Sequence, residues 1–401
     1  MTTANLPLLQ RSSTRALIGF AIGAIVLFAV APTVLSQFRL DLLSKYLCFG
    51  IVGIGIGLAW GRGGLLTLGQ GVFFGLGGYA MAMHLKLADA GPGELPDFMV
   101  LYGSRSTLPD WWTPFSSAAF ALLAVVLLPM FVAFLLGSLV FRRRVRGAYF
   151  AILSQALAAA MVLLIVGQQA TTGGTNGLTD IQSFFGYDLD DPVNRKTVYY
   201  LIAAVVLLLL ALVRQLVQSR YGELLVAVRD SEERVRFLGY DPANVKLFAY
   251  VIAAGMAGIA GALFVCAVGA IYPALIGIVP SIQFVIGVAV GGRASLLGPV
   301  LGSVAVAWAQ TSLSEQFPGF WTYFQGALFI LVVAFLPGGL SSLVTIVRQR
   351  RAGVPPEAIS GEAPPGPEPV PATTPEPATE PARSATEPAQ SATELAKEPQ
   401  P

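Results

Sequence analysis

The sequence predicts an all-α polytopic membrane protein with about ten transmembrane or re-entrant helices and a disordered C-terminal tail. The 401 residues include only 12% charged side chains, about half of the roughly 25% that a soluble domain carries. The mean hydropathy is +0.68. Acidic residues are absent from three long stretches, between Asp41 and Asp89, Asp110 and Asp180, and Asp241 and Glu315. Each stretch holds several segments of the about 20 apolar residues that a spanning helix needs.

Apolar runs place the helices in order along the chain. The stretch 64–88 follows Gly61-Arg62-Gly63-Gly64, a run that disfavours a helix, so a start as a re-entrant segment fits. The pair at 281–314 is interrupted by Gly291-Gly292-Arg293. The predicted spans are 16–35, 40–60, 64–88, 117–141, 147–167, 197–217, 246–269, 281–297, 298–314 and 320–343.

Basic residues give the orientation, because loops on the cytoplasmic side carry an excess of Lys and Arg. With residues 1–15 in the cytoplasm, alternation of the spans places Arg62, the basic cluster 142–146, the loop 218–246 and the basic run 348–351 inside as well. Both termini are therefore predicted to be cytoplasmic.

Three parts of the chain follow from this arrangement. They are a cytoplasmic N-terminus at 1–15, a transmembrane domain at 16–345 that contains the charged segment 219–246, and a tail at 346–401. The tail is rich in Pro, Glu, Ala and Thr and holds nearly half of the 27 prolines. It has too few aliphatic residues to offset the entropy of ordering, so we expect disorder. A dispensable extension is favoured over a specific interaction arm.

Several kinds of site are excluded by composition. The two cysteines, Cys48 and Cys266, lie in apolar runs, and His84 is the single histidine. A disulfide framework and a Cys- or His-rich metal site are therefore excluded, and no P-loop motif is present. We expect no enzyme activity, no metal, no cofactor and no nucleic-acid partner. Lys45 is the one charge inside a clear apolar run, near its outer end, where it can snorkel. A proton or ion pathway is therefore unsupported.

The glycine-rich segment 61–79 is the first candidate for solute contact. Its neutral hydrogen-bonding side chains are Thr67, Gln70 and Tyr79. A broken helix at this depth would expose backbone groups to a polar solute, whereas close helix packing through small residues explains the glycines equally well. The loop 167–181, which contains Asn176, is a second candidate as the mouth of a pathway. A turn-rich connection is the favoured alternative there.

The charged segment 218–246 predicts a docking helix. Asp230 and Glu233 have the spacing of a capping box, and Gly239 is a natural stop. They enclose a helix of about two turns with Val235 and Leu238 on one side. Asp241-Pro242 then begins the next span. Docking onto a cytoplasmic protein is favoured over lipid-surface binding, which would not use so many acidic residues.

Three motifs resemble the branched-chain amino-acid family of ABC importer permeases, of the LivM type. They are Leu66-Thr67-Leu68-Gly69-Gln70 and its continuation to Tyr79, the run from Ser219 to Tyr240, and the run from Val288 to Gly302. Two further runs resemble the urea branch of this family: Glu94–Val100 with the following Leu108-Pro109 and Trp112, and Gly173–Asp180.

The resemblance implies a permease domain at 16–345 in a bacterial inner membrane. The permease would work with a second homologous permease subunit, two cytoplasmic ATPase subunits and a periplasmic substrate-binding protein. Urea or short-chain amides are the implied substrate, branched-chain amino acids are the alternative, and a passive channel or secondary carrier is the alternative of another class. The implied pathway residues are Thr67, Gln70, Phe73, Tyr79 and Asn176. The implied ATPase-coupling residues are Glu223, Arg229, Asp230, Glu233 and Gly239.

Overall fold

A computed structural model describes residues 18–91, 93–103, 107–143, 145, 147–317, 323–327 and 330–331. The predicted all-α fold is confirmed: apart from one β-hairpin with two strands of two residues each, the secondary-structure elements described are helices. The tail 346–401 lies outside the described residues, as does most of the tenth predicted span, 320–343. The boundary at residue 345 therefore stays a prediction.

Six helical segments are long and apolar enough to cross a membrane. They are Gln37–Arg62, Ala118–Arg142, Ala148–Gly167, Pro192–Gln218, Pro242–Val268 and Pro273–Gly291. The labelled elements that form them are α3 (Gln37–Ile56) with η2 (Gly57–Arg62), α6 (Ala118–Arg142), α7 (Ala148–Gly167), α9 (Pro192–Gln218), α12 (Pro242–Val268), and η4 (Pro273–Leu275) with α13 (Ile278–Gly291).

Shorter or less apolar helices complete the bundle. The apolar helix Ile18–Val34 occupies the first predicted span, and includes η1 (Val26–Val30) and α2 (Ala31–Val34). The others are α4 (Gln70–Ala90), α5 (Asp97–Gly103), η3 (Thr113–Ser116), α8 (Gln169–Thr172), α10 (Arg220–Asp230), α11 (Glu232–Phe237) and α14 (Gly298–Gln316). Each of the first nine predicted spans thus holds a helix.

The core is built around α12, which packs against α3, α4 and α6. In their most apolar windows α3 is 78% and α12 72% buried, whereas α6, α7 and α9 are only 22%, 28% and 33% buried. The latter three therefore form the outer layer of the bundle. Glycines allow the close approach of α4 and α12: a Cβ on Gly77 or Gly261 would collide with the backbone of the other helix.

Two of the predicted spans are not continuous helices over their whole length. Residues 64–69 are not helical, so α4 starts only at Gln70 and the predicted break is confirmed. α13 has 14 residues and continues the apolar segment that begins with η4 at Pro273. It ends at Gly291, before Gly292 with its φ of 100°. The predicted continuation of this span to residue 297 is therefore wrong.

The span predicted to start at 197 begins earlier, at Pro192. The Asp191 side chain accepts a hydrogen bond from the Val193 N–H, and Pro192 occupies the first turn. A capping carboxylate followed by proline favours a helix start. The helix therefore includes the polar residues between Asp191 and the apolar run that starts near residue 197.

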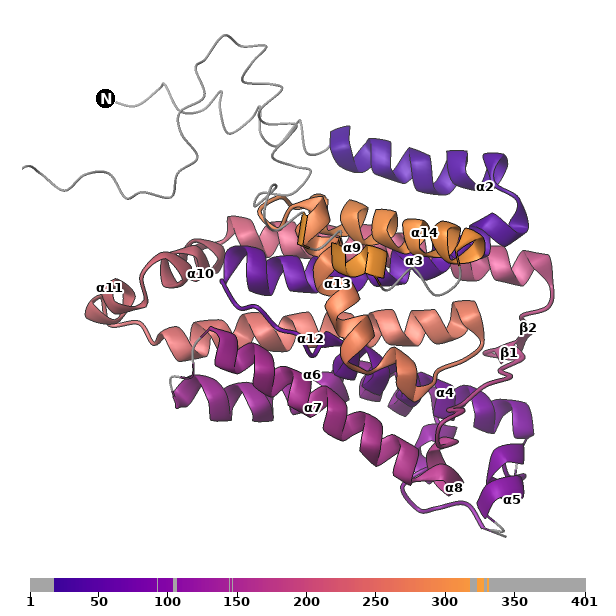
Figure 1. Ribbon diagram of the computed structural model, residues 1–401. Coiled ribbons are helices and arrows are strands. Elements are labelled where there is room, and N and C mark those ends of the chain that lie inside the picture. The colour runs from indigo at the N-terminus through magenta and orange to yellow at the C-terminus, as the bar shows by residue number, and fades with distance from the viewer. Residues whose placement is uncertain are drawn as a thin grey trace, which may run out of the picture. The chain divides into compact units, whose positions relative to one another are not determined.

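The bundle has two distinct ends, seen in Figure 1. At the basic end, Arg62 terminates η2 and α10 and α11 project from the bundle. The hairpin end holds α5, α8 and the strands β1 (Ser183–Phe184) and β2 (Tyr187–Asp188).

Candidate pathway and docking sites

A group of polar side chains without hydrogen-bond partners is buried at the break before α4. Thr67 and Gln70 are at most 1% exposed, and neither the Thr67 hydroxyl nor either polar atom of the Gln70 amide has a partner within the described structure. The Tyr250 hydroxyl of α12 faces Thr67 without reaching hydrogen-bond geometry. A buried polar group left unpaired costs about 1–3 kcal/mol. These groups therefore suit water or a small hydrogen-bonding solute.

Two serines from other helices hold the break in place. The Leu68 N–H donates to the Ser154 hydroxyl of α7 at 3.0 Å, and the Gly71 N–H donates to the Ser281 hydroxyl of α13 at 3.0 Å. Both hydroxyls in turn donate to carbonyls of their own helices. The N-terminus of α4, which carries a positive partial charge, is thus fixed against α7 and α13.

Aromatic rings enclose the polar group. Phe73, one turn after Gln70, meets Tyr250 edge-on with ring centroids 5.5 Å apart. Tyr250 also contacts Phe141 and Phe150. Those two rings line a pocket of about 150 Å³ at the basic end, together with Arg229 and Lys246. The rings therefore lie between the polar group and this pocket.

The structure brings together only part of the predicted pathway. Thr67, Gln70 and Phe73 are neighbours, but Tyr79 lies nine residues after Gln70, about 13 Å further along α4. Tyr79 is buried, and its hydroxyl has no partner in the described structure. Asn176 is exposed at the hairpin end. Its loop is fixed by the paired hydrogen bonds between Leu178 and Ile271.

A groove that the sequence did not indicate opens between α3, α7, α13 and α14. Its volume is about 740 Å³, and its polar side chains are Lys45, Tyr272, Gln283 and Gln310. The Gln283 amide donates to the Gln310 amide. The sequence predicts that Lys45 snorkels to the membrane surface, whereas the structure places it in a groove that three other helices form with α3.

The predicted docking segment consists of two helices rather than one. Ser231, not Asp230, is the N-cap residue of α11, and no side chain caps that helix. The predicted capping box is therefore wrong: Asp230 ends α10 and forms an ion pair with Arg229 at 2.9 Å. The preceding helix α10 was not predicted.

The predicted stop at Gly239 is confirmed. Gly239 has a φ of 86°, and the Tyr240 N–H donates to the Val235 carbonyl in a Schellman motif. Asp241 caps α12 as predicted, with its carboxylate accepting from the Ala243 N–H.

The outer part of α11 is exposed. Val235 is buried, but Leu238, predicted on the same side, is 75% exposed, and Phe237 is 92% exposed. Glu233 is exposed too, whereas Glu232 pairs with Lys246 of α12. Burial raises the pKa of Tyr221 in α10 above its usual range, while its hydroxyl donates to the Val245 carbonyl. α10 and the base of α11 are therefore fixed to α12, and the tip presents apolar side chains beside charges.

Arg229 connects this segment to the break before α4. Its guanidinium donates to the Gly61 carbonyl at 3.0 Å, and its side chain packs where a Cβ on Gly64 would lie. Glu223 lies one to two turns earlier in α10. A displacement of α10 would therefore act directly on the segment leading to Thr67 and Gln70.

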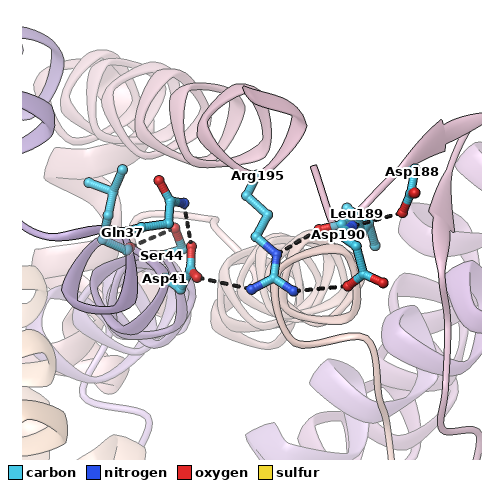
Figure 2. A network of polar contacts seen from close by, with 8 residues as sticks. Gln37, Asp41, Ser44, Asp188, Leu189, Asp190 and Arg195 are labelled. Carbon is cyan, nitrogen blue, oxygen red and sulfur yellow. Dashed lines mark hydrogen bonds and ion pairs between the residues drawn. The ribbon is translucent and has the colours of Figure 1, made fainter. Parts of the chain in front are cut away.

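A polar network fixes the hairpin end, as Figure 2 shows. Arg195 of α9 donates to the Leu189 carbonyl at 2.6 Å and pairs with Asp41 of α3 and Asp190, each at 3.3 Å. Asp41 also accepts from Gln37. On the other side of the hairpin, Asp89 of α4 accepts from the Gln182 N–H. The hairpin thus links α3, α4 and α9.

Comparison with known proteins identifies the family. The sequence profile described as "Branched-chain amino acid transport system / permease component" matches residues 38–333. The chain belongs to this ABC permease family. The match includes the break before α4, the groove and the docking segment, so this permease is a membrane-embedded component of a transport system that has other components.

Two curated relatives agree with the assignment. The high-affinity branched-chain amino acid transport system permease protein LivM of Escherichia coli (strain K12) is 26% identical over 344 residues, covering 80% of this chain and 74% of the relative. LivM of Salmonella typhimurium (strain LT2) is 27% identical over 341 residues, covering 79% and 73%. No solved structure matches the permease.

Proposed function

We propose that this permease imports urea or short-chain amides, driven by ATP hydrolysis in two separate cytoplasmic ATPase subunits. A second homologous permease subunit completes the membrane part, and a periplasmic binding protein delivers the solute. The permease itself is not an enzyme. It lies in the bacterial inner membrane with both termini in the cytoplasm, so that the basic end faces inward.

The observation that carries the substrate assignment is the uncharged polar group at the break before α4. Thr67, Gln70 and Tyr250 offer hydroxyl and amide groups without partners. Urea is small, neutral and rich in hydrogen-bonding groups, so it satisfies such groups without a counter-charge. A fixed charge would be expected beside a charged solute in so buried a place.

Coupling to ATPases is supported by the shape and exposure of the segment 219–246. Exposed apolar side chains at a projecting tip favour contact with a protein, and the flanking charges Glu233 and Arg234 give that contact specificity. Glu223, Arg229, Asp230, Glu233 and Gly239 are proposed to contact the ATPase or to shape the segment.

Branched-chain amino acids are the second candidate substrate, because both curated relatives carry that substrate in their names. Positive helix N-termini, such as that of α4, can also bind a carboxylate.

Uptake of labelled urea and labelled leucine separates the two substrates. The assembled transporter is compared with a Gln70→Leu variant in proteoliposomes loaded with ATP. We expect urea uptake by the parent and a several-fold lower rate in the variant. Leucine uptake without urea uptake would refute the urea assignment.

A passive channel or secondary carrier is tested separately, by charge reversal of Glu232 and Glu233. Reversal disrupts the docking segment, so uptake by an ABC permease should fall strongly. Unchanged uptake in this variant, or in vesicles without ATP, would refute coupling to ATPases.

A further inference from the structure

We propose that the groove between α3, α7, α13 and α14 is a solute-binding site. In it, the Lys45 ammonium donates to the carbonyl oxygen of urea, and the Gln283–Gln310 pair binds its N–H groups. The inference rests on the proposed function for the identity of the solute. In this proposal the solute first contacts the permease in the open groove, and not at the buried break before α4.

The depth of Lys45 is the first reason. Lys45 lies eight residues after the start of the span Gln37–Arg62, about 12 Å along the helix. A partly buried ammonium is unfavourable unless an acidic group, water or another polar group solvates it. Asp41, one turn away, is paired with Arg195, and the described structure shows no acidic partner for Lys45. The ammonium therefore requires water or a polar solute in the groove.

The amide pair is the second reason. The hydrogen bond from Gln283 to Gln310 uses one donor and one acceptor, so the pair retains an acceptor and further donors. Lys45 supplies donors only. Together they match a solute that carries one oxygen acceptor and several N–H donors, which is the pattern of urea.

The form of the groove is the third reason. At one side, Phe49 and Phe284 line it. Phe49 stacks on the buried ring of Phe264, and Phe284 contacts the buried ring of Phe74 at a tilt. Protein therefore closes the groove toward the core. Tyr272, from the segment that precedes η4, lines it near the loop held by Leu178 and Ile271. A solute would thus enter from the hairpin end and meet an aromatic barrier.

The groove is also mechanically connected to the break before α4. The segment that ends at Ile276 forms part of its rim, and Ile276 packs on Gly71 and Gly75 of α4. Ser281 of α13 binds the Gly71 N–H. A movement of α10 that Arg229 transmits to residues 64–69 would therefore also move the wall of the groove.

Urea uptake by the assembled transporter tests the role of Lys45. We expect Lys45→Met to raise the urea concentration for half-maximal uptake about tenfold, because one charge-assisted hydrogen bond is lost. Lys45→Arg retains a charged donor and should restore most of the affinity for urea. The matched control is Lys196→Met, an exposed lysine at the start of α9, which should leave uptake unchanged. If the parent imports urea and Lys45→Met imports it equally well, the groove proposal is wrong while the proposed function stands.

Thiol labelling shows what fills the groove. Val279→Cys lies in the groove and Leu208→Cys on the exposed face of α9, while the native Cys48 and Cys266 are buried. A water-soluble maleimide should label the first variant and not the second, and urea should slow the labelling. Labelling of neither variant, or labelling that no solute slows, would refute a solute site. Protection by leucine but not urea would keep the site and refute the urea assignment.

Discussion

At the scale of single residues, the contact between α4 and α12 depends on glycine. A Cβ on Gly261 would overlap the Phe74 carbonyl, which is backbone and cannot rotate away. We expect Gly261→Ala to lower the stability of the folded permease by about 1–3 kcal/mol, as overpacking does. Gly167→Ala is the control, since nothing lies near its Cβ. Thermal unfolding in detergent measures the stability of both variants. Equal unfolding midpoints would contradict the close contact between α4 and α12.

The serines that cap the break make a second prediction at this scale. Ser281→Ala removes the acceptor of the Gly71 N–H, and Ser154→Ala that of the Leu68 N–H. Each leaves a donor unpaired, buried at Gly71 and partly buried at Leu68, and an unpaired buried donor costs about 1–3 kcal/mol. We expect a lower melting temperature and slower uptake in both variants. Ser138→Ala on α6, whose hydroxyl bonds only within its own helix, should behave like the parent.

Single residues also show where prediction from sequence stops. Thr67 and Gln70 stood out because polar side chains are rare in a glycine-rich apolar run, and the structure buries both. Ser154 and Ser281 carry no such signal, and Lys45 is predicted only to snorkel. Their roles depend on contacts between segments up to 210 positions apart, which no local pattern encodes.

At the scale of elements, Arg229 joins α10 to the end of η2 through the Gly61 carbonyl. We expect Arg229→Ala to reduce the amount of solute moved per ATP hydrolysed several-fold, because motion of the docking segment would no longer reach the break. Arg229→Lys, which retains a donor, should keep part of the coupling. Arg39→Ala, an exposed arginine of α3, serves as control. An unchanged ratio in Arg229→Ala would show that the hydrogen bond does not transmit the motion.

Helix ends were predictable where a local signal was strong, and not elsewhere. The helix start predicted at Asp241-Pro242 and the stop predicted at Gly239 are confirmed, because a capping side chain and a left-handed residue act within one turn of the helix. The capping box at Asp230 failed because α10 continues through that residue. α10 has 11 residues, with charged residues at both ends, and packs against α9 and α12. A search for long apolar runs therefore does not reveal it.

At the scale of the whole molecule, the distribution of charge predicts which end faces the cytoplasm. Arg62, Arg142 and Arg293 lie toward the basic end, where Arg293 stacks on Trp60 with 4.9 Å to the ring centroid. The hairpin end carries Asp188, Asp190 and Asp191 instead. Because basic loops are retained in the cytoplasm, α11 should be inside and the hairpin outside.

Labelling of intact cells checks this orientation with two exposed positions. A membrane-impermeant maleimide should label Asn176→Cys in intact cells, but Glu233→Cys only after the cells are opened. The parent, whose two thiols are buried, should remain unlabelled in both conditions. The reverse pattern would place the docking segment outside, away from ATP. It would then overturn ATPase docking and import together, since both proposals require the basic end of the bundle to face the cytoplasm.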